Sequence, residues 1–270
     1  GTGAEGGNSS TYGYLSSFDS TGFTVTQGTA GGGAAPNGNA YTNQTASAYV
    51  GWGWKSGGTA VSNTDGSITS SVSANVDAGF SIVSYTGNGT AGATVGHGLS
   101  SAPDMIIVKP RVNATGWVVG HSSLNSGTNP WQWYLSLEGT AAQGTTNLVW
   151  NNTAPTSTVF SLGSGTGTNP ASTMIAYCFH SVEGYTKAGS YTGNGSSSDG
   201  PFVYTGHRPS FLLIKRTDAA GTNWWIFDNK RSTFNVVDDG IVANDYAAEY
   251  ADNPGLLIDF LSNGFKVRNT

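Results

Sequence analysis

The chain has 270 residues, a net charge of −5 and only 10% charged residues. It contains no run of Lys or Arg, which argues against a nucleic-acid-binding protein and against a polybasic membrane-binding patch. The longest apolar runs, such as residues 105–108, have the length of a strand and fall far short of a membrane span. A single cysteine, Cys178, excludes an internal disulfide framework and a cysteine-based zinc site.

The composition favours a folded, β-rich chain over a disordered one. Forty glycines and many Ser, Thr and Asn residues accompany 8 Trp, 12 Tyr and 11 Phe, which supply enough apolar area for a core. An uncharged polar surface with many glycine turns is typical of β-rich extracellular or virion proteins. Because the chain begins with Gly1 and not with Met, we expect a processed product or a piece of a longer protein.

Two motifs stand out in the N-terminal part. Residues 18–25 read Phe-x-Ser-x-Gly-Phe-x-Val, and residues 49–54 read Tyr-Val-Gly-Trp-Gly-Trp. In the second motif the bulky side chains alternate with small ones, which predicts a strand with one bulky and one small face, packed between two layers. Residues 59–78, rich in Ser, Thr and Asn, are predicted to be a linker with a short strand near residues 68–72.

An internal duplication begins after this linker. The sequence Ser-Tyr-Thr-Gly-Asn-Gly at residues 84–89 recurs unchanged at residues 190–195. Each copy is followed by a Gly-His pair and by a Pro-led apolar run ending in Lys, at residues 103–109 and 209–215. Glycine turns between apolar runs predict strand, turn, strand, loop and strand, twice over.

Further motifs complete the pattern. Residues 131–138 alternate between apolar and polar side chains, as a half-buried strand does. Residues 174–179 repeat the bulky and small alternation of residues 49–54, and residues 260–267 repeat the Phe-x-Ser-x-Gly-Phe-x-Val motif. Residues 242–252 are the one helix candidate, about two turns long by the helical period.

We therefore predict an all-β chain of tandem antiparallel β-sandwiches, jelly-roll-like, with almost no helix. Residues 1–58 are the C-terminal part of a repeat unit, and residues 59–78 are the linker. Residues 79–183 are a complete sandwich unit. Residues 184–270 are the N-terminal part of a following unit that lacks the final aromatic strand.

A sandwich that lacks a strand exposes edge groups that favour completion by another strand. We expect residues 47–55 to complete residues 184–270, either in the same chain or in a neighbour, as in donor-strand pairing. The duplicated motif at residues 18–25 and 260–267 shows that the two partial units overlap. The competing interpretation is a window cut from a longer repeat array.

These motifs resemble a tandem module of marine bacteriophage virion proteins. The resemblance lies in Gly79-Phe80, in residues 85–89, in the run from Pro103 to Lys109, in Trp117 and in residues 260–267, and it covers nearly the whole chain. Such modules are described as tail-fibre-like, or as concanavalin-like or laminin-G-like jelly rolls. The resemblance implies a β-sandwich and a virion or cell-surface setting. It implies no activity and no functional residues.

No catalytic constellation, metal site or cofactor motif is predicted. His97 and His207 occupy equivalent positions and are interpreted as residues that tether turns, since no second ligand lies at metal-binding spacing. Cys178 aligns with Gly53 of the first partial unit, which favours a small buried residue over a nucleophile. Several carboxylates in the last part could bind calcium, although a solvated turn is the preferred interpretation: Asp238, Asp239, Asp245, Asp252 and Asp259.

Tryptophans are the best binding candidates, because aromatic faces stack on sugar rings while Asn and Asp groups orient them. Trp131, Trp150 and Asn151 lie in a stretch without a copy elsewhere, where a unit-specific function is expected. Trp224 and Trp225 are adjacent, so in a regular strand their rings face opposite sides and one of them faces outward. We predict that the outward ring is Trp224, with Asp228 nearby. Core packing is the alternative role for these tryptophans.

The leading hypothesis is a non-enzymatic structural protein of a phage tail or capsid fibre, located in the virion or on an extracellular surface. Its partners would be copies of itself or other virion proteins. The alternative is a lectin-like module that binds host-surface glycans. A polysaccharide hydrolase ranks third, because only two acidic residues, Asp104 and Glu138, lie between residues 80 and 179.

Overall fold

The computed structural model describes residues 2–5, 13–27, 43, 46–196 and 198–268. The chain divides into two compact units. The N-terminal unit is Glu5–Trp54, and the main unit is Lys55–Thr270 with Gly1–Ala4. Among the described residues, no helix is long and apolar enough to cross a membrane.

A hairpin is the strand pair among the described residues of the N-terminal unit. Strand β1 (Tyr14–Phe18) pairs in antiparallel fashion with β2 (Phe23–Thr26). The backbone N–H of Asp19 donates to the carbonyl of Gly22 at 2.8 Å, which closes the turn. The Asp19 carboxylate accepts a second hydrogen bond, from the Thr24 hydroxyl at 2.7 Å. The first copy of the Phe-x-Ser-x-Gly-Phe-x-Val motif is therefore a hairpin closed by its own polar residues.

The prediction of a strand at residues 49–54 is wrong for this single chain, because these residues belong to no strand. Their counterpart β12 (Thr173–Phe179) is a strand with a paired neighbour on each side. An alternating sequence acquires β structure only where adjacent strands supply the ladder and the packing surface. The alternation in residues 49–54 does not by itself provide those neighbouring strands.

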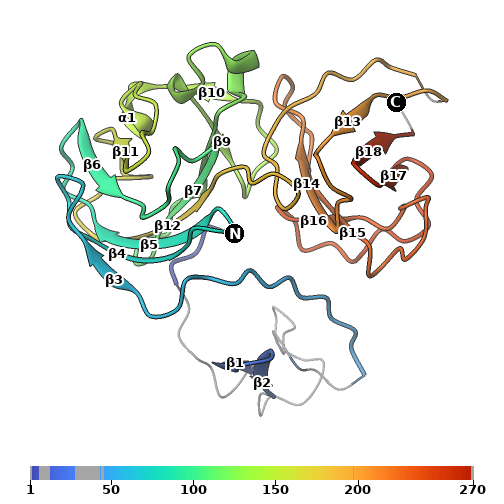
Figure 1. The fold of residues 1–270 in the computed structure, drawn as a ribbon, viewed down its shortest axis with the longest axis horizontal. Coiled ribbons are helices and arrows are strands. Elements are labelled where there is room, and N and C mark those ends of the chain that lie inside the picture. Colours follow the sequence, from blue (N-terminus) through green and yellow to red (C-terminus); the bar gives the residue numbers. More distant parts are fainter. Residues whose placement is uncertain (1, 6–12, 28–42, 44–45, 197, 269–270) are drawn as a thin grey trace. The chain divides into compact units, whose positions relative to one another are not determined.

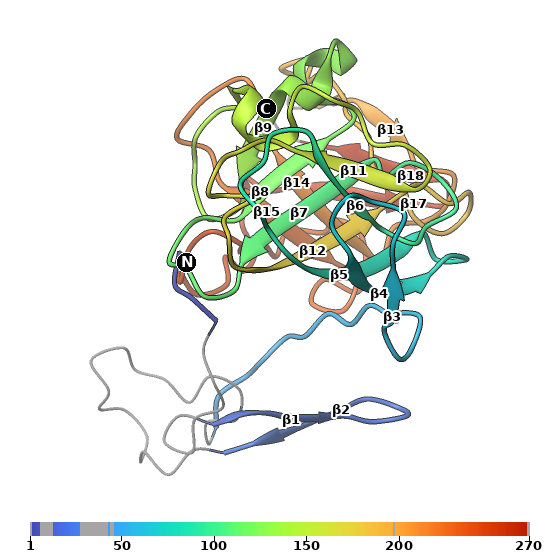
Figure 2. The ribbon, with the colours of Figure 1, turned by 90° about the vertical axis from the view of Figure 1, so that its left-hand side faces the viewer.

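The first sandwich is built from residues 55–183. Its large antiparallel sheet has the order β10-β9-β8-β7-β12-β5-β4-β3, and a small sheet pairs β11 with β6. Figure 2 shows the small sheet lying in front of the large one. The remaining elements are β3 (Val61–Asn63), β4 (Ser70–Asn75), β5 (Phe80–Thr86), β6 (Ala93–Gly96), β7 (Met105–Pro110), β8 (Val118–His121), η1 (Leu124–Gly127), η2 (Pro130–Gln132), β9 (Trp133–Ser136), β10 (Gly144–Thr145), α1 (Asn147–Trp150) and β11 (Val159–Leu162).

The core of the first sandwich lies between these two sheets. Alternate residues of the central strands point into it, and Val83, Ile106 and Ala176 are completely buried. Val95 and Phe160, paired across the small sheet, close the core from the other side. The period-two alternation of the sequence therefore places one face of each strand out of water, at about 25 cal/mol per Å² of apolar surface buried.

The second sandwich is built from residues 184–268 and has two three-stranded sheets, β13-β18-β17 and β14-β15-β16. Val203 pairs with Phe265 in one of these sheets, as Val95 pairs with Phe160 in the first sandwich. The two sandwiches therefore share their architecture as well as their sequence motifs. The strands are β13 (Phe202–Tyr204), β14 (Phe211–Lys215), β15 (Trp224–Asp228), β16 (Ile241–Val242), β17 (Ile258–Leu261) and β18 (Gly264–Val267).

The two sandwiches pack sheet against sheet. Leu213 of β14 and Trp224 of β15 join a cluster with residues on the outer face of the large sheet, among them Ile107, Val119 and Leu135. The opposite face of β14 and β15 belongs to the core of the second sandwich. Figure 1 shows β14, β15 and β16 on the side of the second sandwich that faces the first. Both faces of this sheet are therefore covered.

Hydrogen bonds reinforce this contact. The indole N–H of Trp224 donates to the carbonyl of Ser136 at 2.9 Å. Two backbone N–H groups bond across the same boundary, from Gln143 to the Thr217 carbonyl at 2.8 Å and from Gly221 to the Thr140 carbonyl at 2.9 Å. A buried indole with its N–H satisfied couples the two sandwiches through packing and polar contact at once.

The all-β architecture with antiparallel sheets is confirmed, but two local predictions are corrected. Residues 59–78 are not a linker, since they contain β3 and β4, which extend the large sheet beyond β5. Residues 242–252 form turns and a bridge and no helix. Alanine content suggested a helix there, but the backbone of Tyr250 instead bonds to that of Gly240.

Replacing Trp224 with alanine is expected to destabilise the main unit by about 3–5 kcal/mol, because a large buried side chain is lost between the two sandwiches. Urea unfolding followed by circular dichroism measures the change. Tyr246→Ala, at a fully exposed aromatic residue, is the control and should change the free energy of unfolding by less than about 0.5 kcal/mol. Equal effects of the two substitutions would contradict the sheet-to-sheet contact.

Candidate functional site

Trp131 and Trp150, predicted to stack on sugars, lie inside the first sandwich. Only 5% and 1% of their surfaces are exposed, and their rings meet edge to face with centroids 5.5 Å apart. They fill the space opposite Gly120, where a Cβ atom would come within 2.5 Å and 2.8 Å of the two indoles. A ring buried in this way offers no face to a sugar, so the prediction is corrected and both are core residues.

Asn151, predicted to orient a ligand, ends the short helix α1. Its backbone has a φ of 51°, in the left-handed region that Asn tolerates better than most residues. Its N–H donates to the Asn147 carbonyl at 3.1 Å, and its own carbonyl accepts from the Thr153 hydroxyl at 2.8 Å. Asn151 therefore terminates helix α1. It follows Trp150, which is buried and offers no surface to a ligand.

Trp224 was predicted to face outward, and this prediction is wrong. It is 5% exposed and packs against the first sandwich. Its neighbour Trp225 points into the core of the second sandwich and stacks near Phe227, with centroids 6.5 Å apart. The alternation of the two rings was inferred correctly. The error was to assume that one face of this sheet meets solvent.

Asp228 is buried in an ion pair and not presented to a ligand. Its carboxylate accepts hydrogen bonds from the backbone N–H groups of Lys230 and Arg231 and from the Arg231 Nε at 2.8 Å. Arg231 also donates to the Glu249 carboxylate and to the Ile226 carbonyl. Burial acts to raise the pKa of Asp228, but these hydrogen bonds and the guanidinium charge outweigh it and lower that pKa below its usual value.

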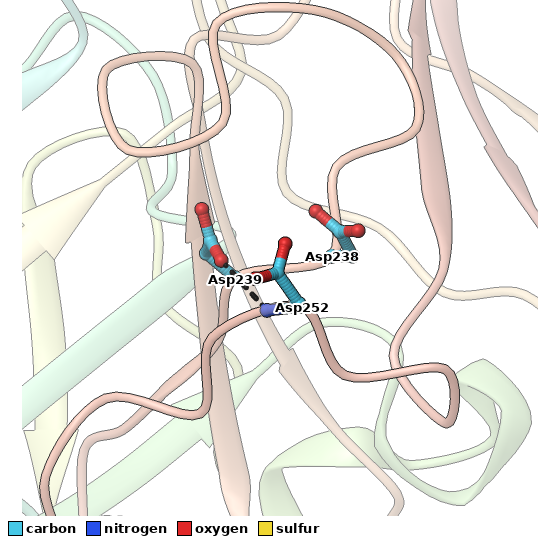
Figure 3. A group of neighbouring side chains, drawn as sticks. All are labelled: Asp238, Asp239 and Asp252. Atoms are coloured by element: carbon cyan, nitrogen blue, oxygen red, sulfur yellow. Dashed lines mark hydrogen bonds between the residues drawn. The ribbon is translucent and has the colours of Figure 1, made fainter.

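Three carboxylates gather in the loops of the second sandwich. Ligand atoms of Asp238, Asp239 and Asp252 all lie within 4.8 Å of one another (Figure 3). Two backbone hydrogen bonds between Gly240 and Tyr250, at 3.0 Å and 2.9 Å, bring the two segments together. All three residues were candidates from the sequence, but only the fold shows that Asp252 lies close to Asp238 and Asp239.

This aspartate cluster, Asp238, Asp239 and Asp252, could hold a hard cation such as Ca²⁺, which takes oxygen ligands. Carboxylate oxygens of this cluster also stabilise the loop directly by accepting hydrogen bonds. Asp239 accepts from the Ser232 hydroxyl at 2.8 Å with one oxygen and from the Asp252 N–H at 3.1 Å with the other. Of the remaining predicted carboxylates, Asp259 pairs with Arg268 and Asp245 accepts from the N–H of the next residue.

Exposed aromatic rings lie in the loops around this cluster, and the sequence analysis did not single them out. Phe234 is 82% exposed, Tyr246 is fully exposed and Tyr250 is 37% exposed. Tyr250 also contacts Trp225 edge to face, with centroids 5.3 Å apart. These three aromatic residues could have been identified from the sequence by their position in residues 232–255, a stretch with no counterpart in the other repeated parts of the chain.

Hydroxyl groups line a shallow depression of about 320 Å³ on the large sheet of the first sandwich. Ser62, Ser71 and Ser84 lie side by side on neighbouring strands. Thr86 and Thr173, paired on β5 and β12, extend the row. Of the eight residues that line it, Tyr85 alone is titratable, and its hydroxyl donates to the Thr168 carbonyl at 2.6 Å. The depression offers hydrogen-bonding groups but no acid, base or poised nucleophile.

The side chains of His97 and Cys178 have structural roles, as predicted, whereas the buried Nδ1 of His207 has no hydrogen-bond partner among the described residues, so the tether predicted for it is not seen at that atom. The His97 ring bonds to the Thr156 carbonyl at 3.1 Å and to the Leu99 N–H at 3.2 Å, which tethers the turn after β6. Burial lowers the pKa of His97. Cys178 is completely buried, and burial raises the pKa of its thiol to about 12, so the thiolate that a nucleophile needs is not formed near neutral pH.

The fold and these contacts define a class of protein: an all-β chain of stacked antiparallel sandwiches with repeated motifs. Residues 2–270 match the family described as a domain of unknown function (DUF7483), and the chain belongs to that family. No curated protein and no solved structure matches the chain.

Replacing Asp228 with alanine is expected to cost about 3 kcal/mol at pH 7, the lower end for breaking a buried ion pair, because the buried guanidinium of Arg231 keeps only the more exposed Glu249 as a charged partner. The side chains of Arg231 and Asp228 are only 10% and 4% exposed. The matched control is Asp218→Ala, which breaks the exposed Arg216–Asp218 pair and should have no measurable effect on stability.

The pH dependence follows from the lowered pKa of Asp228. Its stabilising contribution is complete above the unfolded-state pKa of ~4 and is lost as the pH falls through the lower folded-state value. Asp228→Asn should therefore flatten the loss of stability below pH 4 relative to the wild type, as measured by urea unfolding between pH 2.5 and 7. An unchanged slope would contradict this assignment.

Proposed function

We propose that this chain is a non-enzymatic structural module of a surface assembly, such as a phage tail or capsid fibre. It would act in the virion or on an extracellular surface, through assembly and display. Its partners would be copies of itself or other proteins of the same particle.

The observation that carries this proposal is the sheet-to-sheet contact between consecutive sandwiches. The cluster around Val119, Leu135 and Trp224 joins them through buried apolar side chains, and a buried indole hydrogen bond fixes their orientation. Repeated modules that stack through such faces form quasi-one-dimensional arrays, in which each unit contacts its neighbours. A stiff stack of this kind suits a fibre or a spacer.

The use of polar and aromatic residues also supports a structural role. Trp131, Trp150 and Trp224 are core or interface residues, Asp228 is buried in an ion pair, and Cys178 is buried. A polysaccharide hydrolase ranks last, since both oxygens of Asp239 in the aspartate cluster already accept hydrogen bonds within the loop, from the Ser232 hydroxyl and from the Asp252 N–H.

Immunogold electron microscopy of the particles or cells that produce the chain tests this proposal. We expect regular labelling along a filament or on the surface of a particle. Labelling confined to the cell interior, or depolymerisation of polysaccharide by the purified chain in a reducing-end assay, would overturn it.

The second candidate function is glycan binding at the loops of the second sandwich. The observation that favours it is the group of exposed rings, Phe234, Tyr246 and Tyr250, in the loops that also carry the aspartate cluster. Exposed aromatic faces stack on sugars, and carboxylates accept hydrogen bonds from sugar hydroxyls. The site differs from the one predicted around Trp131, Trp150 and Trp224.

A glycan array probed with the wild type and with Tyr246→Ala tests this candidate. Binding should fall at least about ten-fold in the variant if the ring stacks on sugar, an effect of roughly 1.4 kcal/mol. Phe18→Ala, at an 84% exposed ring of the N-terminal unit, is the matched control and should bind as the wild type does. The absence of any bound glycan at high protein concentration would remove this function.

A further inference from the structure

The outer face of the large sheet of the first sandwich carries an array of hydroxyl groups on and beside strands β3, β4, β5 and β12. All of these strands belong to the main unit. The array lines the shallow depression of about 320 Å³ and is called the hydroxyl face below. Its six side chains lie in two rows that cross the strands, a serine row and a threonine row: Ser62, Ser71 and Ser84, and Thr69, Thr86 and Thr173.

The serine row is formed by direct cross-strand pairs. Ser62 on β3 pairs with Ser71 on β4, and Ser71 pairs in turn with Ser84 on β5. Neighbouring strands lie about 4.8 Å apart, so three hydroxyls follow one another at that spacing. Because serine is short, a row of serines leaves the surface hollowed and keeps the hydroxyls close to the backbone of the sheet.

The threonine row lies two residues farther along the same strands. Thr86 on β5 pairs with Thr173 on β12. Thr69 lies immediately before Ser70, and since Ser70 pairs with Tyr85, Thr69 lies opposite Thr86. Side chains two residues apart on a strand share a face, so the two rows form one array on the outer face of the sheet.

The six hydroxyls of this array make no hydrogen bond to any other described residue. Five of the six residues are exposed, and Ser84 is half-buried. The other two residues that line the depression are Ser70 and Tyr85, whose hydroxyls donate inward to backbone carbonyls at 2.9 Å and 2.6 Å. Within the described part of the chain, the hydroxyl face therefore presents its donors and acceptors outward.

The depression has no charged residue in its lining. Seven of its eight lining residues are Ser or Thr, and the eighth, Tyr85, has a buried ring. Arg111 follows the threonine row across the ladder but does not line the depression. Hydroxyls both donate and accept, which matches a ligand that carries hydroxyls itself. A sulfate or carboxylate group would lose water here without gaining a cation, which is unfavourable.

Apolar side chains border the array on one side. Ile175 on β12 pairs with Ser84 and so continues the serine row. Two residues farther along β12, Tyr177 stacks near Trp117, with ring centroids 6.4 Å apart. These three side chains are half-buried. A sugar ring has apolar C–H faces as well as hydroxyl groups, so a surface that combines hydroxyls with apolar groups suits both parts of such a ligand.

The hydroxyl face is a property of the first sandwich and not of the repeat. Half of its residues come from β3, β4 and the connection between them, within residues 59–78. In the second copy, the segment between β12 and Ser190 contains a turn closed by a bridge between Val182 and Thr186, and no strand. The strands that carry this part of the array therefore have no counterpart there.

We propose that the hydroxyl face is a binding site for a neutral oligosaccharide. The sugar hydroxyls would exchange hydrogen bonds with the two rows, and the apolar face of a ring would lie against Ile175. This site adds ligand binding to the structural role proposed above and does not depend on that role. It is also separate from the loops of the second sandwich.

A glycan array that holds neutral and anionic oligosaccharides, probed with the full chain, tests the proposal. Ser71→Ile fills the middle of the serine row with a β-branched side chain, which strands favour and which offers a sugar no ring, charge or hydroxyl. We expect the wild type to retain neutral glycans and the variant to bind them at least about ten-fold more weakly. Circular dichroism verifies that the variant is folded.

A second variant removes hydroxyls at nearly constant size. The Thr86→Val/Thr173→Val double variant should bind the same glycans at least about five-fold more weakly, because two hydrogen bonds are lost. The matched control is Thr145→Val, at an exposed threonine of β10 on the opposite edge of the same sheet. This control should bind as the wild type does.

Three outcomes would overturn the proposal: an array on which no glycan is retained, retention of anionic glycans alone, or binding that survives both Ser71→Ile and the double variant. Tyr246→Ala separates this site from the loops of the second sandwich. A glycan that is lost from Tyr246→Ala but kept by Ser71→Ile binds at those loops and contradicts the hydroxyl face. The structural role is tested separately, by the immunogold experiment.

Discussion

The ladder that β12 makes with β5 and β7 is the interaction on which the first sandwich depends. Strand β12 pairs with β5 along its whole length and with β7 along nearly all of it. Its inward side chains, Met174, Ala176 and Cys178, are completely buried. The chain contains its own comparison. The first three residues of the repeated six, Ser84 to Thr86, end strand β5 beside β12, whereas their copies at residues 190–192 are exposed and belong to no strand. Non-local pairing, and not local propensity, therefore decides the structure of this sequence.

The contact between the two sandwiches follows from the same sheet. Its apolar outer positions on β7, β8 and β9 are too extensive to face water and are covered by β14 and β15. The polar outer positions on β3, β4 and β5, such as Ser62, Ser71 and Ser84, face solvent. The outer face of this one sheet thus has an apolar part, which packs against the next sandwich, and a polar part, which stays in contact with water. This division is the physical basis of the proposed assembly role.

Much of the fold could be predicted from the sequence, because repeats and alternation are strong local signals. The all-β architecture with antiparallel sheets, the strands around Met105 and Phe160, and the structural roles of His97 and Cys178 were predicted correctly. The tryptophan site was not, since alternation shows which residues share a face but not what covers that face. Trp224 was placed outward because a single sandwich has a solvent face, whereas here a second sandwich covers it.

The aspartate cluster and the exposed rings of residues 232–255 show a second limit of sequence reasoning. Asp239 and Asp252 are thirteen positions apart, and only the backbone bonds between Gly240 and Tyr250 bring them together. Loops of this kind carry no period from which their contacts can be inferred. In a chain whose repeated parts are used for packing, the loops that do not repeat are where a binding function would be placed.

Amide hydrogen exchange of the chain tests most directly whether the central strand decides the structure of its neighbour. It compares equivalent residues of the two repeat copies, which share Ser-Tyr-Thr at residues 84–86 and 190–192, within one molecule and under one set of conditions. The amides of residues 81–86 should exchange slowly, close to the rate set by global unfolding, while those of residues 187–192 should exchange near the rate of an unstructured peptide. Equal protection of the two segments would contradict the dependence of this fold on β12.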